Sequence, residues 1–203
     1  MTVYKLVISQ DADPMTPREW SNLGQMVCLH KRYDLGDAHD LKSGMFESWA
    51  ELKQYLIKEE NAAVILPLYL IDHSGLSMSV TPFGCPWDSG QVGFIYATQQ
   101  AILQEYGKKR LTARLKQRVE QALVSEVDVY HRYLSGDVWE YALFDEDDNF
   151  VEGCAGFFGY DDAREEGEQM KCYLEQKEAQ ERQQQRQQQV AQLLGFFPSS
   201  QLV

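Results

Sequence analysis

The sequence predicts an α+β fold with a largely antiparallel sheet, packed helices and a long polar C-terminal helix. Segments with strand-like patterns come in consecutive pairs, with amphipathic segments between the pairs, which favours an antiparallel over a parallel sheet. After Tyr160 the composition changes to Glu, Gln, Lys and Arg, which is typical of a solvated helix. We therefore expect the 203 residues to form a single α+β core domain over 1–160 and a Gln/Glu-rich helical extension with an apolar tail over 161–203.

Alternating or continuous apolar residues predict strands over 3–9, 62–71, 76–80, 92–97, 138–144 and 150–158. Pro67 interrupts the second of these runs. Because proline cannot donate to a strand ladder, we expect Pro67 at a bulge or at an unpaired edge position. The last two strands flank Asp145–Asn149 and predict a hairpin with an acidic tip.

Apolar residues at helical spacing predict helices over 48–61, 98–106, 112–134 and 161–192. Thr16 and Pro17 suit the N-cap and first position of a further short helix through Val27. The C-terminal helix has a sparse apolar face, with Met170, Tyr173 and Leu174, then Val190, Leu193 and Leu194. Because so little of it can be buried, we expect it to project, to pair with another chain or to fray. The short apolar tail 195–198 follows.

Charge and hydropathy exclude some classes of function. Lys and Arg total 19 and Asp and Glu total 31, a net charge of −12, so we expect no direct binding to nucleic acid. No apolar run approaches the roughly 20 residues that span a bilayer, so we expect no membrane partner. The first residues resemble no secretory signal, and we expect a cytoplasmic protein with reduced cysteines. The oligomeric state is left open.

Two segments, 22–37 and 73–94, carry most of the chemically reactive residue types in loops between strands. One interpretation is nucleophilic catalysis, with Cys85 attacking, His73 as base and Asp88 or Asp37 orienting the imidazole. This chemistry requires the thiol to lie beside the imidazole.

A second interpretation is a metal site drawn from Cys28, His30, His73 and Cys85. Zinc prefers about four nitrogen or sulfur ligands with a local pair among them. Cys28 and His30 are one residue apart, so they share a face only on a strand. A bound metal ion is thus an open alternative, and no cofactor is favoured.

The same residues fit a purely structural interpretation. Prolines and glycines then shape the second loop, Phe83 and Trp87 fill the core, and Asp88 binds backbone amides. The histidines divide into an interior pair, His30 and His73, and a surface pair, His39 and His131. Cys154 and Cys172 are expected to be small buried hydrophobic residues.

The motifs PREW-x-NLG-x-MVC-x-H (17–30) and PF-x-CPWDSGQVGFIY (82–96) are long enough to be specific. With Tyr33, 35–37, 73–75, 136–138 and 156–159, they resemble a family of uncharacterised proteins encoded by bacteriophages, prophages and plasmids. The resemblance covers roughly 3–160 and implies an accessory gene of a mobile element. It carries no established activity, and the Gln-rich extension departs from it.

We therefore expect an acidic accessory protein that binds a host protein stoichiometrically, for example a nucleic-acid-processing or defence component. An acidic surface can occupy a basic channel and speed association by steering. The expected contact residues are Trp87 and the hairpin tip: Asp145, Glu146, Asp147 and Asp148. The alternative is a small thiol- or metal-dependent enzyme that uses His73, Cys85 and Asp88.

Overall fold

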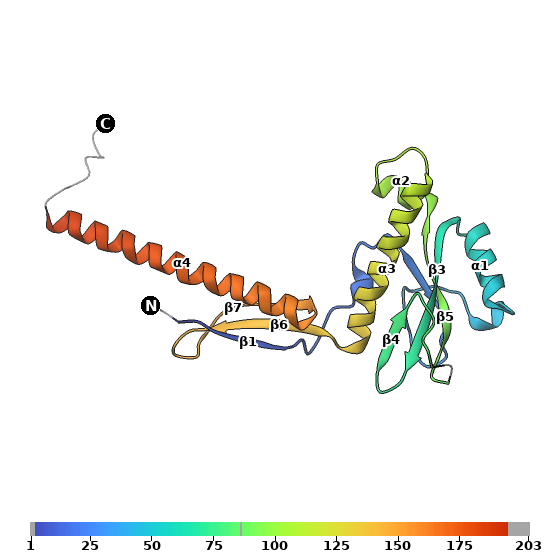
Figure 1. Cartoon of the computed structure of the whole chain (residues 1–203), viewed down its shortest axis with the longest axis horizontal. Coiled ribbons are helices and arrows are strands. Elements are labelled where there is room, and N and C mark those ends of the chain that lie inside the picture. The colour runs from blue at the N-terminus through green and yellow to red at the C-terminus, as the bar shows by residue number, and fades with distance from the viewer. Residues whose placement is uncertain (1–2, 86, 195–203) are drawn as a thin grey trace. The chain divides into compact units, whose positions relative to one another are not determined.

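The computed structural model describes residues 3–85 and 87–194, which form the α+β fold that the sequence predicts, with two antiparallel sheets (Figure 1). The chain divides into two compact units: Met1–Ala12 with Val138–Val203 (unit 1) and Asp13–Asp137 (unit 2). The boundary expected between residues 160 and 161 falls inside unit 1. Pro86 and the apolar tail 195–198 lie outside the described residues.

Unit 2 is built on a four-stranded sheet in the order β2-β5-β3-β4. Met26 and Ile95 face α3, whereas Val27 and Phe94 face α1, so a helix covers each side of the sheet. Because both faces are covered, β5 is buried from Val92 to Ala97 and has a continuous apolar sequence. The elements are β2 (Gln25–Cys28), α1 (Trp49–Lys58), β3 (Ala62–Asp72), β4 (Leu76–Ser79), β5 (Ser89–Thr98), α2 (Gln99–Glu105) and α3 (Ala113–Ser135), with 3-10 turns η1 (Pro17–Glu19) and η2 (Ser43–Met45).

Local capping explains where the helices of unit 2 begin. The hydroxyl groups of Ser48, Thr98 and Thr112 accept the backbone N–H groups that open α1, α2 and α3. Helix α3 ends at Gly136, whose φ of 73° is the left-handed conformation that closes many helices. The helices predicted over 48–61, 98–106 and 112–134 are therefore confirmed.

The short helix expected from Thr16 through Val27 is wrong. Only Pro17–Glu19 form a helical turn, and Gln25–Cys28 form strand β2. Thr16 does cap that turn, but pairing of β2 with β5 overrides the local preference beyond it. Pro67 meets its expectation, because β4 pairs with β3 only from Tyr69 onward and leaves one side of Pro67 without a strand.

Unit 1 is a three-stranded sheet in the order β1-β6-β7, with α4 packed on one face. Ala163 and Gly167 are the buried residues of the helix, and Met170 and Leu174 pack against the core of the sheet. A Cβ on Gly167 would lie 2.6 Å from the Leu6 side chain, so glycine permits this close approach. The elements are β1 (Lys5–Gln10), β6 (Val138–Phe144), β7 (Phe150–Phe158) and α4 (Tyr160–Leu193).

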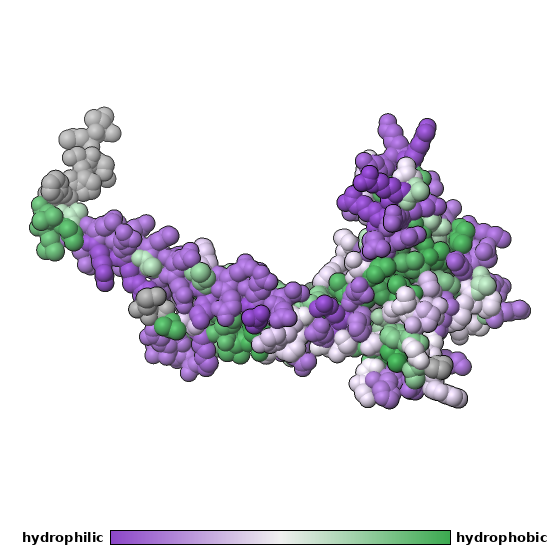
Figure 2. Space-filling model, in the orientation of Figure 1, coloured by the Kyte–Doolittle hydropathy of each residue, from purple (hydrophilic) through white to green (hydrophobic). Residues whose placement is uncertain are grey.

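From Glu175 to Gln189, α4 is polar and largely exposed, as its sparse apolar face predicts, and the end of the helix carries the exposed apolar residues Val190, Leu193 and Leu194 (Figure 2). Tyr173, which we expected on the apolar face beside Met170 and Leu174, is 59% exposed. Cys154 and Cys172 are exposed rather than buried, since they lie on the edge strand β7 and on α4. Within the described ranges, no helix is both long and apolar enough to cross a membrane.

Candidate functional site

The two segments that the sequence singles out meet at one end of the sheet in unit 2. Pairing of β2 with β5 sets Cys28 opposite Gly93, and the Leu29 N–H donates to the Val92 carbonyl at 2.7 Å. Beyond β2, Arg32 forms an ion pair with Asp72 at the end of β3.

A pocket of about 340 Å³ lies at this end of the sheet, and we call this region the Trp87 corner. The pocket is lined by His30, Arg32, Asp72, Trp87, Asp88 and their neighbours.

Trp87 lies at the surface of this corner and is 92% exposed. The structural interpretation that placed Trp87 and Phe83 in the core is therefore wrong, since Phe83 is half-buried and belongs to none of the core clusters. Both residues lie between the end of β4 and the start of β5, outside the sheet. Trp87 is thus available for contact, as the binding hypothesis requires.

The three residues of the catalytic hypothesis converge, but with the carboxylate in the middle. Asp88 Oδ2 lies 3.7 Å from Cys85 Sγ and 3.3 Å from His73 Nδ1. In a thiol–imidazole–carboxylate triad the imidazole occupies the middle place. No hydrogen bond joins Cys85 to His73 among the described residues, and both His73 and Asp88 are largely exposed. The alternative orienting residue, Asp37, is engaged elsewhere.

The four metal candidates do not assemble. Cys28 is buried, and burial, reinforced by the negative charge of Asp37, raises the pKa of its thiol to about 12. The Nδ1 atom of His30 accepts the N–H groups of Arg32 and Tyr33 at 3.3 and 3.2 Å. Across residues 3–85 and 87–194, no three His, Cys, Asp or Glu side chains are grouped so that they could hold a metal ion.

The histidines differ from the structural interpretation as well. His73, expected in the interior, has 72% of its side chain exposed. His39 and His131, expected at the surface, are half-buried, and each has a buried Nδ1 with no partner among the described residues. Because the neighbours of both histidines in sequence are polar, the sequence does not indicate this burial, which results from tertiary packing.

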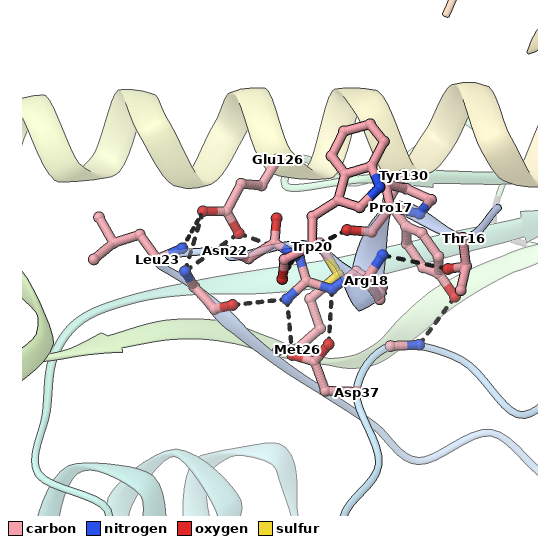
Figure 3. Close-up of polar contacts among 12 residues, drawn as sticks. Thr16, Pro17, Arg18, Trp20, Asn22, Leu23, Met26, Asp37, Glu126 and Tyr130 are labelled. Carbon is pink, nitrogen blue, oxygen red and sulfur yellow. Dashed lines mark hydrogen bonds and ion pairs between the residues drawn. The ribbon is translucent and has the colours of Figure 1, made fainter. Parts of the chain in front are cut away.

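The first motif segment is organised around one buried cation, Arg18, whose side chain is only 5% exposed (Figure 3). Its Nε and Nη2 atoms donate to the two carboxylate oxygens of Asp37 at 2.8 and 2.7 Å. Nη2 also donates to the Gly24 carbonyl at 2.7 Å, and Nη1 donates to Glu126 at 3.2 Å. Burial by itself lowers the pKa of Arg18, but its hydrogen bonds and ion pairs with Asp37 and Glu126 outweigh this and raise it.

Both carboxylates in turn fix backbone. Glu126 accepts the N–H groups of Leu23 at 2.9 Å and Gly24 at 3.1 Å, and Asp37 accepts that of Met26 at 2.7 Å. This cluster therefore holds the start of β2 against α3. Because four of the five Arg18 donors and both carboxylates bind other parts of the protein, the cluster is structural.

Glu126 is not among the residues that the sequence singles out. It lies on α3 three residues after Leu123 and four before Tyr130, both buried, so it occupies the buried face of the helix. A carboxylate within an apolar helical stripe was the signal that could have found it.

The acidic hairpin tip has the predicted form, but part of its charge serves the turn. Asp145 accepts the N–H groups of Asp147 and Asn149, both at 2.9 Å, and the Asn149 side chain. The hydrogen bond from the Asn149 side chain, followed by that from its backbone, lowers the pKa of Asp145. Asp148 pairs with Lys5 at 3.0 Å, and Glu146 accepts the Val3 N–H at 3.1 Å.

Models of known protein families, curated protein sequences and solved structures gave no significant match to this chain.

Proposed function

We propose that this protein acts by stoichiometric binding to another protein, and that the Trp87 corner is its principal contact surface. The observation that carries the proposal is the 92% exposure of Trp87 beside Arg32. Trp and Arg are among the residue types that contribute most to binding at interfaces, because they desolvate large areas and donate hydrogen bonds.

Arg32 and Tyr33 make contacts at the Trp87 corner that suit a specific protein interface. Arg32 and Tyr33 share Asp72 as acceptor, and Arg32 also lies over the Tyr33 ring at 5.3 Å from its centroid. These contacts favour one orientation of the Arg32 and Tyr33 side chains before a partner binds. Preorganisation of this kind reduces the entropy lost on binding.

The partner that we propose is a host protein, in line with the resemblance to proteins of mobile elements; a nucleic-acid-processing or defence component fits the net charge of −12. In this proposal the acidic tip of the β6–β7 hairpin accelerates encounter by long-range attraction, whereas Trp87 supplies affinity.

The first experiment is native mass spectrometry of the protein purified without chelator, which reports a bound partner, a metal ion and the oligomeric state together. The partner so identified is then titrated against Trp87→Ala and against Trp20→Ala, which removes another exposed tryptophan of unit 2. We expect Trp87→Ala to weaken binding about 30-fold or more, the range of an interface hot spot. Equal affinity in both variants would refute the assignment of this corner.

The acidic tip has its own test. Neutralising Asp145, Glu146, Asp147 and Asp148 to Asn or Gln is expected to slow association and to reduce its dependence on salt. An association rate that ignores both the substitutions and the salt concentration would contradict the proposed steering.

A thiol-dependent enzyme is the second candidate, because Asp88 lies beside both Cys85 and His73, although no hydrogen bond joins the thiol to the imidazole among the described residues. A catalytic thiolate reacts quickly with iodoacetamide below neutral pH, whereas an ordinary thiol does not. The exposed Cys154 is the internal reference. If Cys85 reacts no faster than Cys154 at pH 6, the enzyme hypothesis fails.

A further inference from the structure

A separate pocket of about 340 Å³ lies on the α1 face of the sheet in unit 2. Its walls come from β2, from the loop after Asp37, from the last turn of α1 and from Tyr96 on β5. The polar residues that line it are Gln25, Asp37, His39, Asp40, Tyr55, Glu60 and Tyr96. None of them belongs to the Trp87 corner.

Tyr96 is the central residue of this pocket. It is 4% exposed, and its hydroxyl group has no hydrogen-bond partner among the described residues. Tyr96 lines the pocket together with Asp37 and Glu60. Burial, and then the negative charges of Glu60 and Asp37, raise its pKa to about 12. The rest of the residue is enclosed, but the hydroxyl oxygen is not among the fully buried atoms of the described residues, so it is open to a donor that enters the pocket.

His39 provides a second unused atom in the same wall. Its Nε2 lies 3.1 Å from the Cys28 carbonyl, which can only accept, so Nε2 carries the proton. The other ring nitrogen, Nδ1, is buried and has no partner among the described residues.

The charge of the pocket is negative and largely uncompensated. Arg18 neutralises Asp37, but Asp40 and Glu60 form no ion pair among the described residues. No Lys or Arg lines the pocket. The pocket also lies beside the carboxyl end of α1, where a helix favours positive charge.

A metal ion does not fit this arrangement, since the described residues offer no group of three suitable ligands. The volume suits a small organic group instead, and the tyrosine rings can face a cation. We propose that this pocket binds an organic cation, an alkylammonium or guanidinium group. Glu60 and Asp40 pair with its charge, and the Tyr96 hydroxyl group accepts one of its N–H groups.

The test is to titrate the full chain with cadaverine and with agmatine, which are free organic cations. Calorimetry and amide chemical shifts measure the binding. Capped lysine and arginine amides serve as models of a protein side chain, and 1-pentanol is the uncharged control. If the free amines bind, the ligand of the pocket is a small molecule. If only the capped amino acids bind, the ligand is a side chain of a peptide or protein. Both support the cation site, and no binding at millimolar concentration would overturn it.

Variants locate the site. Glu60→Gln and Tyr96→Phe are each expected to weaken binding about tenfold, the effect of one charge-assisted hydrogen bond. Glu59→Gln changes the same charge one residue away, outside the pocket, and is expected to leave binding unchanged. Equal losses for Glu59→Gln and Glu60→Gln would mean that the cation responds only to overall charge, and would overturn the assignment. If Tyr96→Phe does not fold, Asp40→Asn replaces it in the test, because Asp40 is exposed and its substitution does not disturb the core.

Discussion

Replacement of Arg18 by methionine tests the most consequential structural assignment, the buried cation that joins β2 to α3. Methionine keeps much of the side-chain length but removes four hydrogen bonds: two to Asp37, one to the Gly24 carbonyl and one to Glu126. The carboxylates then remain only 27% and 16% exposed and lose their counter-charge. Removing one partner of a buried ion pair costs about 3–5 kcal/mol, and this is the loss that we expect.

Urea unfolding measures this loss. Trp20, Trp49 and Trp87 all belong to unit 2, so tryptophan fluorescence reports mainly on that unit. The control is Arg32→Met, which removes a largely exposed ion pair in the same unit and is expected to cost about 1 kcal/mol or less.

A double-mutant cycle measures the interaction energy between Arg18 and Asp37. Adding Asp37→Asn to Arg18→Met removes one of the charges left unpaired, so the two substitutions together are expected to cost less than the sum of their separate effects, by about 0.5–3 kcal/mol. If Arg18→Met costs no more than Arg32→Met, or if the two losses in the cycle simply add, Arg18 does not stabilise unit 2 as a buried cation paired with Asp37.

Three further predictions concern packing, alkaline pH and thiol reactivity. A Cβ on Gly93 would lie 1.8 Å from the Val27 carbonyl oxygen, so Gly93→Ala is expected to destabilise unit 2 by about 3 kcal/mol or more in urea, whereas Gly90→Ala, with open space around it, is not. The hydrogen bond to Glu178, and then burial, raise the pKa of Tyr4 to about 12. The stability that Tyr4 contributes is therefore fully present below pH 10 and is lost as the pH rises towards 12. In Glu178→Gln, spectrophotometric titration should show the pKa of Tyr4 moving back towards 10. Cys28 is expected to resist iodoacetamide at pH 8 in the folded protein and to react after unfolding in urea, and rapid labelling of the folded chain would contradict its burial.

Some features of this protein follow from the sequence alone because neighbouring residues decide them. The capping residues Ser48, Thr98 and Thr112 mark helix starts within one residue, since a hydroxyl group needs only the next turn to accept from. The β6–β7 hairpin follows equally from two apolar runs around an acidic turn. The long polar helix is predicted for the same reason, because its periodicity and composition extend over many turns.

Other features are decided only when distant parts of the chain meet. Strand β2 carries a good helix start before it, yet it becomes a strand because β5 supplies its hydrogen-bond partners. The ion pairs of Arg18 join residues 19 and 108 positions away, and no local pattern specifies such partners. Exposure is decided in the same way. The sequence shows Trp87 as an aromatic residue in a loop, but only the packing of the sheet leaves Trp87 facing solvent and buries Tyr96. Burial and long-range pairing are properties of the packed chain, which is why the sequence indicates the residue types of the candidate sites and the tertiary structure decides which of them meet.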